Sequence, residues 1–114
     1  MGIAETIEKK KATIQEKTVK AAINDARHIA SILVKKFGAS EVILYGSLIG
    51  KKNFDSASDI DIAVKGLGDK YLKAYGYCLR NSKFNLDIKA YEDMPQKFRK
   101  VVDTKGVNLR DWTD

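Results

Sequence analysis

Residues 41–47 read EVILYGS and residues 58–64 read SDIDIAV, and these two runs decide the fold. The first is a short apolar run of strand-forming residues that ends at a glycine and a serine. The second alternates acidic and apolar residues, which is typical of a strand with one buried face. A third run, FNLDIKAY at residues 84–91, alternates in the same way and predicts a third strand.

A long helix is predicted before the first strand. From Val19 to Phe37, apolar residues recur every three or four positions, and Gly38 is expected to cap the end of that helix. Upstream, a thinner stripe of isoleucines surrounds three consecutive lysines, so we expect the helix to extend toward the N-terminus.

Two shorter helices are predicted around the third strand. The first starts near Asp69, which is expected to cap it, and runs to about Arg80. The residues expected on its core face are Leu72, Tyr75 and Leu79. The second has Pro95 in its first turn and ends at Gly106.

Together these elements predict an α/β (α+β) fold, in which a short mixed sheet packs against helices on one of its faces. A length of 114 residues suits one compact domain. Within it we expect a long N-terminal helical segment over residues 1–38 and a core over residues 39–114. The opposite face of the sheet is expected to be exposed and to need a partner.

The composition excludes several classes of protein. The single cysteine, Cys78, excludes an intramolecular disulfide. No apolar run approaches the roughly 18 residues of a membrane span, so we expect no membrane partner. The N-terminus lacks the pattern of a signal peptide, and we expect a cytoplasmic protein.

The formal net charge of +6 raises the question of nucleic-acid binding. The excess lies at the two ends, with +4 over residues 1–36 and +2 over residues 94–114, whereas residues 37–93 are neutral. This distribution favours contact with nucleic acid that is at most weak and non-specific.

Three aspartates form the pattern that carries chemistry. Asp59 and Asp61 are two positions apart on one predicted strand, so their side chains share a face about 7 Å apart. Asp87 joins them if the apolar faces of both strands meet one core. Three such carboxylates repel one another, so one would be protonated or a cation must neutralise them. Mg²⁺ with nucleotide phosphates has the chemistry that such a cation site requires. Gly46 and Ser47 suit phosphate binding, because glycine allows close approach and a hydroxyl and free amides can contact the phosphate.

These motifs resemble those of a known superfamily. LYGS at residues 44–47, SDIDIAV at 58–64 and LDI at 86–88 are similar to the motifs of the polymerase-beta-like nucleotidyltransferases. Among them, the short chain resembles the minimal nucleotidyltransferase (MNT) domains that are paired with HEPN proteins. The resemblance covers roughly residues 40–106 and includes FRKVV at 98–102, which is similar to the closing helix of the family.

The resemblance implies a small nucleotidyltransferase fold and a Mg²⁺-dependent enzyme. Asp59, Asp61 and Asp87 would bind two Mg²⁺ ions, and Asp87 would also activate the attacking hydroxyl. The implied reaction is in-line attack on the α-phosphorus of ATP with release of pyrophosphate. Two metal ions would stabilise the attacking and leaving oxygens.

The resemblance also implies where the nucleotide and the acceptor bind. Gly46 and Ser47 would hold the triphosphate, and Lys51 and Lys52 are candidates for further contacts to it. The implied role is that of an antitoxin, in which AMP is transferred to a tyrosine of a HEPN ribonuclease toxin and silences it.

Two other functions stay open. The chain could keep this fold and neutralise its partner by complex formation without turnover, or its basic ends could make it a nucleic-acid-binding domain. Tyr71, Tyr75 and Tyr77 could stack on bases or form a helix packing face. His28 is expected on a helix surface and Cys78 in the core.

Overall fold

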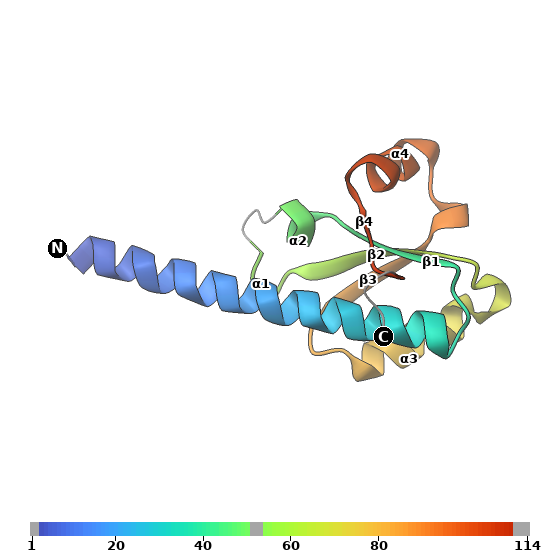
Figure 1. The fold of residues 1–114 in the computed structure, drawn as a ribbon, viewed down its shortest axis with the longest axis horizontal. Helices are drawn as coiled ribbons and strands as arrows, with labels where there is room; N and C mark the ends of the chain where they lie inside the picture. Colours follow the sequence, from blue (N-terminus) through green and yellow to red (C-terminus); the bar gives the residue numbers. More distant parts are fainter. Residues whose placement is uncertain (1–2, 51–53, 111–114) are drawn as a thin grey trace.

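The structure, a computed structural model, describes the backbone of residues 3–50 and 54–110 and the side chains of residues 15–50 and 54–110. Its helices are α1 (Ile3–Lys35), α2 (Ser47–Gly50), α3 (Tyr71–Asn81) and α4 (Gln96–Lys105), as shown in Figure 1. Short 3-10 turns, η1 (Gly68–Lys70) and η2 (Tyr91–Asp93), precede α3 and α4. Helices and a mixed sheet together make an α+β fold, so the predicted class is confirmed.

Four strands form one sheet with the order β3-β2-β1-β4. They are β1 (Glu41–Tyr45), β2 (Asp59–Lys65), β3 (Asn85–Ala90) and β4 (Val107–Asn108). β1 pairs antiparallel with β2 and with β4, whereas β2 and β3 run parallel. The first three are the expected strands. The fourth is an addition to that expectation, because two residues are too few to show an alternation.

Helices cover both faces of the sheet. In Figure 1, α1 and α3 lie on one side of the sheet and α4 lies on the other. On the side of α4, Met94 and Val102 pack against Ile43 and Ala63 in a small second core. The expectation of helices on only one face is therefore wrong. The chain after β3 returns over the sheet because these apolar side chains are buried there.

The long helix α1 packs through small residues. Ala22, Ala26 and Ala30 recur every four positions and are completely buried. At the end of the helix Gly38 adopts φ +76°, and its amide donates to the carbonyl oxygen of Val34 at 3.1 Å, which confirms the predicted cap. Although α1 has 33 residues, neither it nor any other helix in the described part of the chain is long and apolar enough to cross a membrane.

A buried carboxylate joins α1 to the segment that leads into β3. Asp25 is only 7% exposed. Its oxygens accept hydrogen bonds from the hydroxyl of Ser82 at 2.5 Å and from the amide of Lys83 at 3.4 Å. Because a buried carboxylate is costly without such donors, these bonds fix the start of β3 against the helix.

The predicted packing face of α3 is wrong at Leu72 and Leu79 and right at Tyr75, which packs against the core. Leu72 and Leu79 are 78% and 51% exposed, whereas Ala74 and Cys78 are buried. The helical period allows either stripe to face the core, and small side chains allow α3 to approach α1 more closely than leucines would. The predicted burial of Cys78 is confirmed, and desolvation raises the pKa of its thiol to about 11.

Two smaller expectations about side chains have opposite outcomes. Asp69 does not cap α3, because it lies in η1; the N-cap residue is Lys70, which makes no capping bond through its side chain. The preceding 3-10 turn takes the place of a side-chain cap. His28 is exposed on α1, as predicted.

Two of the three tyrosines of α3 contact β3, the outer strand of the sheet. The hydroxyl of Tyr71 donates to the carbonyl oxygen of Ile88, and the hydroxyl of Tyr75 donates to that of Leu86 at 2.9 Å. Tyr77 packs edge-to-face on the ring of Phe37, with centroids 5.7 Å apart. These contacts favour the packing interpretation of the three tyrosines over base stacking.

Candidate functional site

The three aspartates lie on the sheet face that α1 and α3 leave uncovered. The strand register places Asp61 between Tyr45 of β1 and Asp87 of β3. Asp59 pairs with Asn85 two residues earlier on the same face. Residues that alternate with the aspartates point into the main core and are buried, namely Ile60, Ile62, Leu86 and Ile88. The alternation of the strands therefore brings the three acids to one surface.

The carboxyl group of Asp61 has an abnormal pKa. Burial raises the pKa from 3.8 to about 6, and the negative charges of Asp87 and Asp59 act in the same direction. The positive charge of Lys89 acts against them. A cation placed beside Asp61 would therefore stabilise its ionised form at neutral pH.

Lys89 is a cation within this acidic group, and the sequence analysis missed it. Its Nζ donates a hydrogen bond to Oδ2 of Asp87 at 2.6 Å and forms an ion pair with it. That hydrogen bond is the main cause of the raised pKa of the lysine. The available signal was the spacing, because residues 87 and 89 of a strand place their side chains on one face.

The turn after β1 comes very close to Asp61. Gly46 adopts φ +81°, and a Cβ at this position would lie 2.2 Å from Oδ2 of Asp61. Glycine is therefore required both by the backbone conformation and by the space that the carboxylate occupies. Ser47 follows as the first residue of α2 and is exposed. Lys51 and Lys52, the other candidates for triphosphate contacts, lie outside the described residues.

A hydrogen-bonded turn sets the start of β2. The carboxylate of Asp55 accepts from the amide of Ala57 at 2.9 Å, and the amide of Asp55 donates to the hydroxyl of Ser58 at 3.1 Å. These bonds are typical of an Asx turn, and they close the loop immediately before Asp59. Asp59 itself is exposed at the start of the strand.

The aspartates have the ligand chemistry for Mg²⁺ but are not gathered around one point. Carboxylate oxygens are ligands that Mg²⁺ prefers. Within residues 15–50 and 54–110, however, no three Asp, Glu, His or Cys side chains are placed to hold a metal ion. Asp87 is engaged by Lys89. Metal binding by Asp59, Asp61 and Asp87 would therefore need side-chain rotation and release of that lysine.

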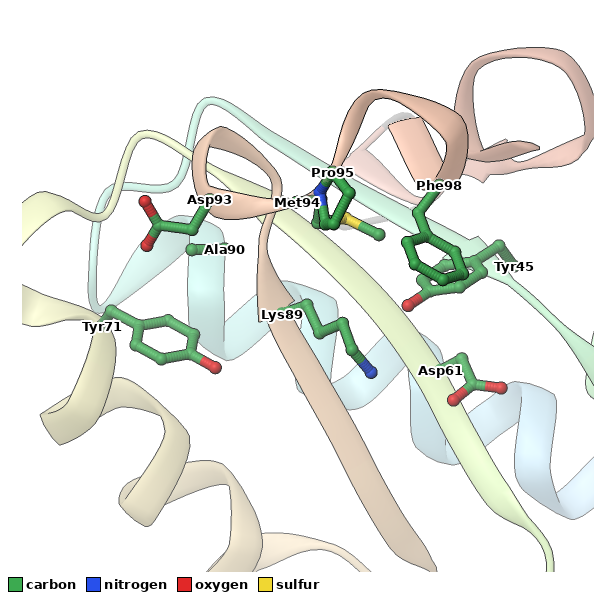
Figure 2. Close-up of a pocket in the computed structure, with 9 residues that line it drawn as sticks. All are labelled: Tyr45, Asp61, Tyr71, Lys89, Ala90, Asp93, Met94, Pro95 and Phe98. Atoms are coloured by element: carbon green, nitrogen blue, oxygen red, sulfur yellow. The ribbon is translucent and has the colours of Figure 1, made fainter. Parts of the chain in front are cut away.

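A cavity of about 480 Å³ lies beside Asp61. It is lined by Tyr45, Asp61, Tyr71, Lys89, Ala90, Asp93, Met94, Pro95 and Phe98 (Figure 2). In Figure 2 the side chain of Lys89 extends toward Asp61, and Asp93 lies at the opposite end of the group. The cavity combines residues of β1, β2, β3 and α3 with η2 and α4, so it depends on how α4 returns over the sheet.

Comparison with known proteins identifies no family for this chain: no family model matches its sequence, and no curated protein matches it. The function is therefore inferred from the geometry and charges of the site, together with the resemblance of its motifs.

Proposed function

We propose that this chain is a Mg²⁺-dependent nucleotidyltransferase that transfers AMP from ATP to a hydroxyl acceptor. The observation that carries the proposal is the setting of Asp61, a half-buried carboxyl group with a pKa of about 6. It lies beside Asp87 and against the turn at Gly46. An acid that favours a neighbouring cation thus adjoins a turn where glycine permits close approach of a phosphate. Mg²⁺ and a nucleoside triphosphate match these two features together.

In this proposal the residues of the site have separate roles in metal binding, phosphate binding and proton transfer. Asp59, Asp61 and Asp87 would hold Mg²⁺, which supplies positive charge to the triphosphate and to the attacking and leaving oxygens. The amide and hydroxyl of Ser47 would bind the outer phosphates. Asp87 would accept the proton of the acceptor hydroxyl while the oxygen of that hydroxyl forms a bond to the α-phosphorus. The bond from that phosphorus to the bridging oxygen breaks, and pyrophosphate leaves with the electron pair.

The acceptor and the biological role are proposed from the resemblance of the motifs. The acceptor is a tyrosine of a HEPN-type toxin, and the role is that of its antitoxin, acting in a hetero-oligomer in the cytoplasm. Leu72 and Leu79 give α3 an exposed apolar face that suits such a partner. Contact with nucleic acid is expected to remain weak and sensitive to salt.

A second function is favoured by the ion pair between Lys89 and Asp87. A lysine that neutralises a metal ligand would lower the affinity for Mg²⁺. A chain with such a site could still bind its partner and neutralise it by complex formation, without nucleotidyl transfer.

The Asp61→Asn variant separates the two functions. Wild type and variant are incubated with labelled ATP, Mg²⁺ and a HEPN-type protein encoded next to the chain, and the partner is analysed by intact mass. The enzyme should add AMP-sized increments, and Asp61→Asn should add none although it still binds the partner. Asp69→Asn, an exposed acid outside the site, is the matched control and should retain transfer. Complex formation without transfer by the wild type would overturn the enzymatic proposal and support the second function.

A further inference from the structure

Lys89 brings a positive charge of the protein into the acidic group around Asp61. Its Nζ donates to Oδ2 of Asp87 at 2.6 Å, and its side chain also lines the cavity beside Asp61. Figure 2 shows the lysine extending from β3 toward the Asp61 carboxylate. Among the described residues that line the cavity, Lys89 carries the one positive charge. A ligand that enters the cavity next to Asp61 would therefore meet this ammonium group.

The ammonium group occupies the position on Asp87 that a metal ion would take. A Mg²⁺ ion lies about 2.0–2.1 Å from a carboxylate oxygen, and the nitrogen of Lys89 lies 2.6 Å from Oδ2 of Asp87. A metal ion on the same oxygen would be repelled by the ammonium group at short range. Because residues 87 and 89 share one face of β3, the lysine is held beside Asp87 by the strand itself.

Asp59 and Asp61 remain as ligands for a single metal ion. Their side chains share one face of β2, and neither forms an ion pair with a side chain of residues 15–50 or 54–110. Mg²⁺ is usually bound by one or two carboxylates together with the phosphates of a substrate. Two aspartates and a triphosphate are therefore sufficient for one ion, without a contribution from Asp87.

We propose that Lys89 takes the place of a second metal ion and is a catalytic residue of nucleotidyl transfer, in a site that holds a single Mg²⁺ ion. The inference rests on the proposed function, from which it takes ATP and the reaction. It differs from the two ions that the resemblance of the motifs implies. In this site the ion pair with Asp87 orients the lysine for the reaction.

The ammonium group would act on the α-phosphate. It donates to an oxygen of this phosphate and stabilises the negative charge that develops there while the acceptor oxygen bonds to phosphorus. The bond from phosphorus to the bridging oxygen breaks, and pyrophosphate leaves with the electron pair. The proton of the acceptor hydroxyl moves to the oxygen of Asp87 that Lys89 does not contact.

The number of metal ions per chain tests the inference without turnover. Mn²⁺ is titrated into the chain with α,β-methylene-ATP, which cannot transfer AMP, and bound ions are counted by electron paramagnetic resonance. The wild type should bind one ion. Lys89→Met should bind two, because Asp87 becomes free as a ligand, whereas Lys89→Arg keeps the charge and should bind one. Lys65→Met removes a lysine that pairs with Glu41 on the same sheet, and this matched control should bind one.

The dependence of transfer on Mg²⁺ gives a second measurement. With Mg²⁺ at the concentration of ATP, Lys89→Met should lower kcat about 100-fold or more, as expected when one donor to the developing charge is lost. Excess Mg²⁺ should restore part of this loss, because a second ion can then take the position that the lysine has left. A purely structural role of Lys89 would give a loss that Mg²⁺ does not restore, and Lys65→Met should transfer AMP at the wild-type rate.

The outcomes separate this inference from the enzymatic proposal. Two ions in the wild type would show that metal displaces Lys89, and would overturn the inference even if AMP is transferred. One ion in both the wild type and Lys89→Met, or an unchanged kcat of Lys89→Met, would overturn it as well. One ion in the wild type and two in Lys89→Met, in a chain without transfer, would support the replacement of an ion by Lys89 and reject the enzymatic proposal.

Discussion

The ammonium nitrogen of Lys89 lies 2.6 Å from Oδ2 of Asp87, so a protein cation occupies the acidic face of the sheet. This lysine lowers the pKa of the neighbouring Asp61 carboxyl, which nevertheless remains raised to about 6. One lysine therefore does not fully offset the burial of Asp61 and the charges around it. The same lysine competes with any metal ion for the Asp87 carboxylate.

Lys89→Met should tighten the binding of divalent cations, because the ammonium group no longer competes for Asp87. The side chains of the pair are 48% and 37% exposed, so the expected decrease in the dissociation constant for Mn²⁺ is modest, up to about fivefold. Titration calorimetry measures it. Lys65→Met is the control, because it removes a lysine that pairs with Glu41 on the same sheet. Weaker or unchanged Mn²⁺ binding by Lys89→Met would contradict the competition.

Asp61→Asn should stabilise the metal-free chain at neutral pH and leave it unchanged near pH 4. The raised pKa of about 6, against 3.8 for an unperturbed group, means that the folded chain favours the protonated acid. Asp61 therefore lowers the free energy of unfolding once it ionises as the pH rises. Because the group is only half-buried, solvent screening limits the difference to about 1 kcal/mol. Urea denaturation at the two pH values measures it, and a difference that does not vary with pH would contradict this origin.

ATP with Mg²⁺ should raise the melting temperature of the wild type, and ATP without the metal should raise it much less. A ligand at about 100 times its dissociation constant adds roughly 2.7 kcal/mol to the free energy of unfolding. Differential scanning calorimetry measures the shift, and Asp61→Asn should lose the part that depends on Mg²⁺. Equal shifts with and without Mg²⁺ would remove the metal site from the proposal.

Gly46→Ala should destabilise the chain and prevent AMP transfer. At φ +81° an alanine costs about 1–2 kcal/mol, and its Cβ would displace the Asp61 carboxylate. Gly50→Ala is the matched control, because a Cβ at that position meets no atom within 4 Å. Chemical denaturation and the transfer assay compare the two. Equal stability and activity of both variants would show that the close approach of Gly46 to Asp61 is not needed.

Strand alternation is sufficient to predict that Asp59, Asp61 and Asp87 share one face. A period of two leaves a single choice once the apolar residues are assigned to the core. The face of α3 is harder to predict, because a helix can present either of two stripes. Here the choice depends on Ala74 and Cys78 approaching the sheet and α1, which is a tertiary contact and leaves no local signal.

The cavity beside Asp61 could likewise not be predicted from the sequence. Phe98 and Met94 reach it only because the chain after β3 folds back over the sheet. That return depends on the burial of Val102 against the sheet and on the pairing of the two-residue β4 with β1. Neither feature has a periodic pattern that a sequence could display.

The hydroxyl groups of Tyr71 and Tyr75 affect whether another strand can add to the β3 edge of this sheet. They bind the carbonyl oxygens of Ile88 and Leu86 on the outer edge of β3. An incoming strand would need those same acceptors to extend the sheet, whether in β-augmentation by a partner peptide or in cross-β aggregation. The two phenols therefore protect this edge against strand addition, and they direct association toward the helices and the edge formed by β4.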